Sequence, residues 1–291
     1  MQSVTYGEIL RKLNETLDFC RHLGLDVDSS RFAAYHQIVF DLNQAIIRDR
    51  EKGVTPSPPE GVTNLEYIVA LTESTEFGEI LPYLVTCAPA LVRKKLVSVL
   101  RGPMLPSDED KNSNEARNIL FELNLAASLS RAGLTPTLGE HPDLQCVVDG
   151  RRLLFECKRP FSDSRVVKRI NQAENQLRSN PRGTRGVIAI SFSKILNPGD
   201  KLFVMENETE GRRGLADALQ AKAERYRRHW LKFYGTDIVG IMFHVITPAI
   251  NKEEDKYAVG QQWNGHPLCD PRSFDYKAFR NLGDALEKAQ Y

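Results

Sequence analysis

Two short apolar segments, 144–148 and 152–157, are joined through the dipeptide Asp149-Gly150, which Arg151 follows. Asp-Gly is a strong signal for a two-residue hairpin turn, because both central residues of that turn need a positive φ. The sequence therefore predicts an antiparallel pair of strands over these segments. A turn at this point also fixes the register, and counting outward from it places Asp143 opposite Glu156 or close to it.

The segments around this hairpin predict an α/β fold. An amphipathic helix is expected over 115–132, where Gly133 provides a C-terminal cap. A strand at 135–138 precedes the hairpin, and helices are expected after it over 164–179 and 214–234. The apolar runs at 186–191 and 238–246 are typical of strands buried on both faces of a sheet. The tail from Asn251 onward is polar and contains aromatic residues, and it is left unassigned.

The first 100 residues have a different pattern, in which apolar residues recur at helical spacing. Helices are expected within 1–50, 65–84 and 90–100. Breaks rich in Pro, Gly or charged residues lie at 53–62 and 101–114. Because the pattern changes at the second break, we expect a domain boundary there. The predicted domains are a helical N-terminal region, residues 1–108, and an α/β domain, residues 109–291.

Composition excludes several classes of protein. The net charge is +1, which argues against a protein that coats nucleic acid without selectivity but allows a local basic surface. The five cysteines include no CxxC pair, so reduced thiols are expected and a zinc site or disulfide framework is not. The N-terminal segment lacks the apolar stretch of a signal peptide, and no apolar run approaches the ~20 residues that span a bilayer. A cytoplasmic protein without membrane contact is expected.

The predicted hairpin brings three charged residues together. Glu156 and Lys158 are two residues apart on one strand and therefore share a face, while Cys157 points into the core. Asp143 returns to the same end of the sheet. Two carboxylates suit a hard divalent cation such as Mg²⁺, which prefers oxygen ligands. The lysine can orient an attacking water or stabilise charge on a phosphate.

Pro142-Asp143 followed by Glu156-Cys157-Lys158 resembles the PD-(D/E)XK signature of restriction-endonuclease-like nucleases. The core of that family is a helix, three strands, a helix and a strand, which matches the order expected over residues 115–191. The resemblance implies that Asp143, Glu156 and the carbonyl group of Cys157 hold a metal ion, Mg²⁺ with Mn²⁺ as a substitute. It also implies that Lys158 is catalytic.

Two further residues fit positions that many members of the family carry. Glu122, eleven residues before Gly133, corresponds to a glutamate of the first core helix, as in archaeal Holliday-junction resolvases, and would be catalytic and metal-binding. Gln176 is similar to a catalytic glutamine in the helix after the lysine, with Gln172 one turn earlier. The resemblance says little about residues 1–110 or 250–291.

Each of these residues also has an interpretation without catalysis. Glu156 and Lys158 can form a solvated charge face on an edge strand, and Asp143 can simply begin a strand after a turn. Glu122 can lie on the exposed stripe of its helix, and a surface glutamine such as Gln176 needs no further role. Residues set aside as candidates are His141, interpreted as a loop residue, His244, as a core histidine, and Cys157, as a small core side chain rather than a nucleophile.

Basic residues follow the lysine, and we expect them to contact backbone phosphates. They are Arg159, Arg165, Lys168 and Arg169. A second basic cluster lies on the helix expected over 214–234 and just before it, and part of it can instead be a solvated helix face. Its members are Arg225, Arg227, Arg228, His229 and Lys232, with Arg212 and Arg213 before them.

The sequence therefore predicts a Mg²⁺-dependent endonuclease or exonuclease that hydrolyses DNA, with bacterial defence or repair as the setting suggested by analogy. Residues 1–108 would select the substrate, form a homo-oligomer or bind a partner protein. One alternative is an RNA or structure-specific nuclease of the same fold. The other is a catalytically silent nuclease-like module that binds nucleic acid or protein.

Overall fold

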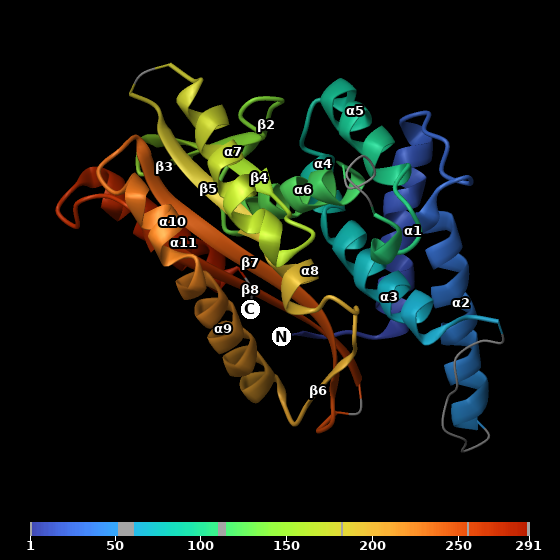
Figure 1. Ribbon diagram of the computed structural model, residues 1–291. Helices are drawn as coiled ribbons and strands as arrows, with labels where there is room; N and C mark the ends of the chain where they lie inside the picture. The colour runs from blue at the N-terminus through green and yellow to red at the C-terminus, as the bar shows by residue number, and fades with distance from the viewer. Residues whose placement is uncertain (1, 52–60, 110–114, 182, 255, 290–291) are drawn as a thin grey trace. The chain divides into compact units, whose positions relative to one another are not determined.

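The computed structural model describes residues 2–51, 61–109, 115–181, 183–254 and 256–289. The fold is α/β, with a helical N-terminal region followed by a curled mixed sheet (Figure 1). This confirms the α/β class and the helical N-terminal region. In the described part of the chain, no helix combines the length and the apolar character needed to cross a bilayer.

The sheet has the strand order β1-β8-β7-β5-β4-β3-β2 among the described residues, and β6 pairs with β7 outside this path. Strands β2, β3 and β4 are antiparallel, whereas β5 is parallel to β4 and β7 is parallel to β5. The strands are β1 (Gln2–Ser3), β2 (Thr137–Leu138), β3 (Leu144–Val148), β4 (Arg151–Lys158), β5 (Arg185–Ser191), β6 (Phe203–Met205), β7 (Ile238–Asn251) and β8 (Lys256–Pro267).

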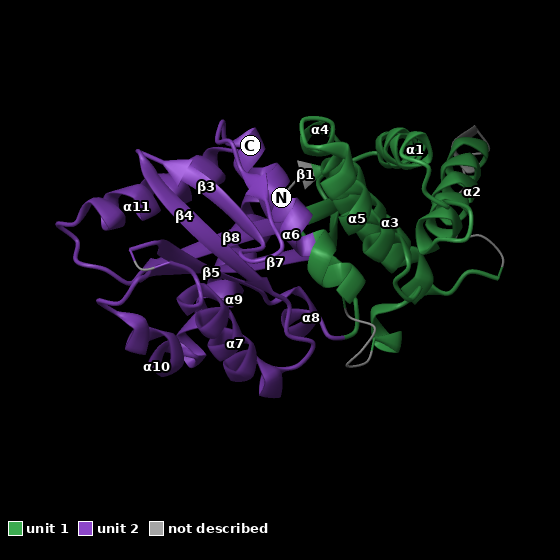
Figure 2. Cartoon of the chain, turned by 90° about the horizontal axis from the view of Figure 1, so that it is seen from above, with its two compact units in different colours: residues 1–120, 199–208, 247–259 green, residues 121–198, 209–246, 260–291 purple. Residues whose placement is uncertain are grey.

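The chain forms two compact units (Figure 2). Unit 1 contains residues 1–120, 199–208 and 247–259, and unit 2 contains residues 121–198, 209–246 and 260–291. Strands β7 and β8 each contribute residues to both units. The predicted division of the chain between residues 108 and 109 stays a prediction.

Unit 1 is mainly helical. Its helices are α1 (Tyr6–His22), α2 (Arg31–Glu51), α3 (Asn64–Glu79), α4 (Leu81–Leu84), α5 (Pro89–Leu100) and the short 3₁₀ turn η1 (Pro106–Asp108). Helices α1 and α3 begin with capping boxes, formed by Thr5 with Glu8 and by Thr63 with Glu66. In each box the threonine hydroxyl accepts a hydrogen bond from the backbone N–H of the glutamate. The glutamate carboxylate accepts one from the backbone N–H of the threonine, so two donors at the helix start are satisfied.

A buried ion network lies inside unit 1. The carboxylate of Glu73 accepts hydrogen bonds from Arg31 Nε, at 3.0 Å, and from Arg117 Nε. Arg117 also pairs with Glu109 at 3.3 Å and donates to the carbonyl oxygens of Pro103 and Met104, each at 3.1 Å. Two guanidinium groups therefore balance two buried carboxylates and hold part of the segment predicted as a break, 101–114. Residues 110–114 of that break and 53–60 of the earlier one lie outside the described residues.

Unit 2 contains most of the sheet and the helices that cover its two faces. These helices are α6 (Glu115–Arg131), η2 (Asp163–Arg165), α7 (Val166–Arg178), α8 (Ser193–Leu196), α9 (Glu208–Arg225), α10 (Arg227–Trp230), η3 (Leu231–Phe233) and α11 (Phe274–Lys288). Helices α6 and α9 begin with residues of unit 1. One core cluster joins a face of the sheet to α6 and α11, and the other joins the opposite face to α7 and α9. Alternation along each strand assigns its side chains to these two clusters.

The helix predicted over 214–234 is broken after Arg225, and this part of the prediction is wrong. The indole Nε1 of Trp230 donates to the carbonyl oxygen of Ala223 at 3.2 Å, so a side chain takes an acceptor of the last turn. The chain continues as the short helices α10 and η3.

The last 40 residues hold two elements that the sequence left unassigned, β8 and α11. Helix α11 is capped by Ser273, whose hydroxyl accepts the N–H of Tyr276 at 3.0 Å. It buries Ala278, Phe279, Leu282 and Leu286 against the sheet. The first predicted strand, 135–138, is reduced to β2, and the strand predicted over 238–246 extends to Asn251 as β7.

Candidate active site

The turn between β3 and β4 has the predicted geometry. Asp149 and Gly150 both have a positive φ, 49° and 75°, and Val148 pairs with Arg151 on either side of them. The register continues to the pair Leu144–Phe155, so the next position places Asp143 beside Glu156. The predicted hairpin and its register are confirmed.

Strand β4 separates its side chains between the two faces of the sheet as predicted. Phe155 and Cys157 lie in the core cluster on the α6 side, whereas Leu154 lies in the cluster on the α7 side. Glu156 and Lys158 share the parity of Leu154 and therefore project toward α7. Cys157 is 3% exposed, and burial raises the pKa of its thiol well above the usual range. It is a core side chain and not a thiolate nucleophile.

Asp143, Glu156 and Lys158 contact one another at the end of the hairpin. Lys158 Nζ lies 3.0 Å from Glu156 Oε2 and 3.6 Å from Asp143 Oδ2. The backbone N–H of Cys157 donates to Asp143 Oδ2 at 2.7 Å, which fixes this carboxylate against β4. Glu156 is completely buried, and its second oxygen, Oε1, has no hydrogen-bond partner in the structure.

The electrostatics of this cluster are unbalanced. Burial, together with the nearby carboxylate of Asp143, raises the pKa of Glu156 to about 7, although Lys158 opposes the shift. Burial disfavours the charged form of Lys158, but attraction to Asp143 and Glu156 outweighs it and raises the pKa of the ammonium group. Two carboxylates share one cation, so a further positive charge at Glu156 Oε1 would be stabilised.

His141 belongs to the same site, which the sequence interpretation missed. A ligand atom of His141 and one carboxylate oxygen from each of Asp143 and Glu156 lie within 4.8 Å of one another. The loop that presents His141 is closed by a hydrogen bond of 2.9 Å from Gly139 N to the carbonyl oxygen of Asp143. A Cβ atom at Gly139 would collide with the carbonyl oxygen of Pro142, so this turn requires glycine.

Gln176 reaches the site through His141. Its amide nitrogen lies 3.4 Å from His141 Nδ1, although the two residues are 35 positions apart and Gln176 is on α7. A histidine placed two residues before an aspartate was a signal that the sequence offered, but histidines are also common in loops. The contact with α7 could not be seen from local spacing.

Glu122 is not one of the three residues that converge on a possible ion in the described part of the chain. It is buried on α6, at 8% exposure, so its alternative interpretation as part of an exposed stripe is wrong. Its charge helps to raise the pKa of the Cys157 thiol, which lies on the α6 side of the sheet. Glu156 and Lys158 project to the other side.

The four basic residues expected to contact phosphate are in different environments. Lys168 is exposed, whereas Arg169 is half-buried and donates to Gln172 Oε1 at 3.0 Å. The guanidinium of Arg165 lies 5.6 Å from the ring centre of Phe161, and Arg159 takes part in other interactions within the chain. Positions 169, 172 and 176 follow one face of α7 at helical spacing, Lys168 lies to the side of it, and Arg165 is the residue just before the helix.

The second basic cluster is partly neutralised within the structure. Asp163 pairs with Lys222 at 2.7 Å and with Arg225 at 3.3 Å. Its side chain also accepts a hydrogen bond of 2.6 Å from the hydroxyl of Tyr226. These contacts give this part of α9 a structural role next to the start of α7.

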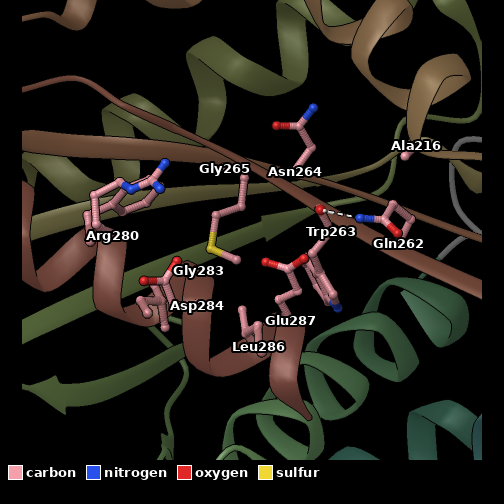
Figure 3. Close-up of a pocket in the computed structure, with 13 residues that line it drawn as sticks. Ala216, Gln262, Trp263, Asn264, Gly265, Arg280, Gly283, Asp284, Leu286 and Glu287 are labelled. Atoms are coloured by element: carbon pink, nitrogen blue, oxygen red, sulfur yellow. Dashed lines mark hydrogen bonds between the residues drawn. The ribbon is translucent and has the colours of Figure 1, made fainter. Parts of the chain in front are cut away.

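A pocket of about 300 Å³ lies elsewhere in unit 2, between β8, α11 and Ala216 of α9 (Figure 3). Its lining includes apolar side chains such as Met242 and Phe279 and the charged residues Arg280, Asp284 and Glu287. Gln262 there donates to the carbonyl oxygen of Trp263 at 3.0 Å. None of the predicted site residues lines this pocket.

Comparisons with known proteins leave the interpretation to the geometry: no protein-family model, curated protein or solved structure matches the chain. The group formed by Asp143, Glu156, Lys158, His141 and Gln176 is therefore judged on its own chemistry.

Proposed function

We propose that the protein is a metal-dependent nuclease of the PD-(D/E)XK kind that hydrolyses phosphodiester bonds of DNA. One observation carries this proposal: a hairpin turn brings two buried carboxylates and one ammonium group together, and leaves Glu156 Oε1 without a partner. A structural ion pair does not need an unpaired buried carboxylate oxygen, which is costly to desolvate. A site that receives a cation needs such an oxygen, because the bound cation becomes its partner.

The donor set suits a divalent metal ion. Asp143 and Glu156 provide oxygen atoms on one side of the sheet, and the carbonyl group of Cys157 is the third ligand implied by the resemblance. When bound, such an ion lowers the pKa of a coordinated water and polarises a phosphoryl oxygen. The proposed ion is Mg²⁺, with Mn²⁺ as a substitute.

The side chains of the chain itself have separate roles in this proposal. Lys158, held by both carboxylates, is placed to orient a water or to stabilise negative charge on the phosphate. Arg165, Lys168 and Arg169 would bind backbone phosphates near the start of α7. Glu122 would act from α6 on the environment of Cys157, and Gln176 would act through His141.

The test uses the purified full-length chain with single- and double-stranded DNA and RNA, in Mg²⁺, in Mn²⁺ or in EDTA. We expect cleavage of DNA that EDTA abolishes, and no cleavage by the variants Asp143→Asn and Glu156→Gln. Asp284→Asn and Glu287→Gln, which change exposed carboxylates of α11, are matched controls and should retain activity. Circular dichroism and thermal melting establish that all four variants fold.

Three outcomes would count against the proposal. They are the absence of cleavage with either metal, cleavage that persists in EDTA, and full activity of a folded Asp143→Asn or Glu156→Gln variant. Cleavage of RNA alone would retain the site and reject the DNA substrate. Metal binding without cleavage would favour a silent nuclease-like binding module.

A further inference from the structure

His141 provides a nitrogen atom beside the two carboxylates. Its ligand atom lies within 4.8 Å of the oxygen atoms of Asp143 and Glu156, and its ring is exposed whereas both carboxylates are buried. The histidine therefore stands at the solvent-facing side of the group. A cation that enters between the three side chains would meet two oxygen donors and one imidazole.

Two observations indicate which atoms remain for that cation. Lys158 already contacts Glu156 Oε2 and Asp143 Oδ2, and the N–H of Cys157 also bonds to Asp143 Oδ2. Glu156 Oε1 is completely buried and has no partner. This unpartnered oxygen is an observation independent of the clustering, and it points to a missing positive group.

The side chain of Gln176 limits the orientation of the histidine. Its amide lies 3.4 Å from Nδ1, and the opposite orientation of that amide would offer Oε1 as an acceptor for an Nδ1–H group. A hydrogen bond on one ring nitrogen fixes the tautomer and leaves the other nitrogen, Nε2, with its lone pair. Metal-binding histidines are commonly held in this way.

We propose that His141 is a metal ligand oriented by Gln176, and that its imidazole nitrogen, added to the oxygen ligands of the site, makes the site bind Mn²⁺ in preference to Mg²⁺. The inference rests on the metal site of the proposed function but not on its substrate. Mg²⁺ requires oxygen ligands, whereas imidazole favours first-row transition metals and carboxylate is compatible with Mn²⁺.

The experiment measures binding of Mn²⁺ and Mg²⁺ alone to the full-length protein by calorimetry, and the coordination of Mn²⁺ by pulsed electron paramagnetic resonance. We expect an imidazole nitrogen coupling to bound Mn²⁺ that disappears in His141→Ala. The same variant should lose about 100-fold in Mn²⁺ affinity and little in Mg²⁺ affinity, because only the transition metal uses the nitrogen.

Gln176→Ala should weaken Mn²⁺ binding by about 10-fold, the smaller effect of losing a group that orients a ligand. Asn175→Ala, on an exposed position of the same helix, and His22→Ala, on an exposed position of α1, are matched controls and should bind like the parent.

A parent protein that binds Mn²⁺ without nitrogen coupling would overturn the inference, as would the absence of Mn²⁺ binding or an equal loss of both metals in His141→Ala. These results are distinguishable from failure of the proposed function. If nitrogen coupling is present and no nucleic acid is cleaved, the function is wrong and the ligand assignment stands. If DNA is cleaved and His141→Ala binds Mn²⁺ like the parent, the ligand assignment is wrong and the proposed function stands.

Discussion

Each unit contains a buried cluster of acidic and basic side chains, and the two clusters differ in how completely their charges are paired. In unit 1, Glu73 accepts hydrogen bonds from Arg31 and Arg117, with Glu109 balancing the second guanidinium. In unit 2, Asp143 and Glu156 share the single ammonium group of Lys158.

The pKa values of the two glutamates move in opposite directions. Burial would raise the pKa of Glu73, but attraction to Arg117 and Arg31 outweighs it and lowers the value. Burial and Asp143 raise the pKa of Glu156 to about 7. Both carboxylates are buried, so burial alone does not identify a functional group. The difference lies in pairing, since a paired charge contributes to the fold and an incompletely paired charge requires a ligand or a proton.

The largest expected effect is a difference in the free energy of unfolding when one glutamate of each cluster is replaced. Glu73→Gln should lower the free energy of unfolding by about 3–5 kcal/mol, because it removes the buried carboxylate that Arg31 and Arg117 share and leaves Glu109 to balance Arg117 alone. Glu156→Gln should leave that free energy unchanged or raise it in metal-free protein, because it removes a poorly solvated charge and retains an acceptor for Lys158. Urea denaturation at pH 8 measures both. Equal losses would show that the two clusters are both structural.

The second prediction concerns Lys158, the shared cation. Lys158→Ala should reduce the rate of DNA cleavage by about 10²–10³-fold, the typical cost of removing one donor that stabilises a transition state. Metal affinity should not fall, because the variant also removes a competing positive charge. Lys277→Ala, at an exposed position of α11, is the control. Parent-like cleavage by Lys158→Ala would make the cluster an ion pair without a catalytic role.

The third prediction uses pH. Glu156 has a folded pKa of about 7, above its usual 4.5, so its protonated form stabilises the fold below pH 4.5 and this contribution is lost as pH rises to 7. Glu73 behaves oppositely, since its lowered pKa gives stability above pH 4.5 that is lost as pH falls. The parent should therefore lose stability relative to Glu156→Gln between pH 5 and 8.

Denaturation curves of the metal-free proteins at each pH provide this measurement. The difference between parent and variant cancels titrating groups that do not interact with Glu156, including His244, whose pKa is lowered to about 3 by burial. A difference that does not change with pH would place the folded pKa of Glu156 near its usual value.

The smallest expected effect concerns the basic residues around the site. Lys168→Ala, at an exposed position, should reduce the salt slope of duplex DNA binding by about 0.9 if it makes one phosphate contact. Arg169→Ala should have a similar effect and should also release Gln172. Fluorescence titrations at several salt concentrations, in a Glu156→Gln background, test both. An unchanged slope would leave these residues as a solvated face, and a loss on one DNA sequence alone would indicate contacts to bases.

Much of the site was predictable because it depends on local patterns. The Asp149-Gly150 turn, the alternation along β4 and the opposition of Asp143 and Glu156 follow from a two-residue turn and a period of two. The buried character of His244 was also predicted correctly; it contacts Ser191 and Gln261 and is 1% exposed.

The remainder depends on contacts between distant residues. Spacing alone could not place His141 against Gln176, or end α9 through the bond from Trp230 to Ala223. The sequence of helix α11 has apolar residues at helical spacing. Strand β8 contains few apolar residues toward its end, and its position depends on pairing with the neighbouring strands β1 and β7. The sequence also could not show on which side of α6 the Glu122 side chain lies, because this helix is buried on nearly all sides.

The two-residue turn at Asp149 and Gly150 has a consequence for how this protein can change. The turn sets the number of residues between Asp143 and Glu156, and β3 presents alternate residues to opposite faces. One inserted or deleted residue anywhere between Asp143 and Glu156 would move Asp143 to the wrong face while the core residues compete for the original register. Such length changes should be far more damaging than substitutions of exposed side chains in the same segment, such as Val147. A library of single-residue insertions and substitutions across 144–155 would measure that asymmetry directly.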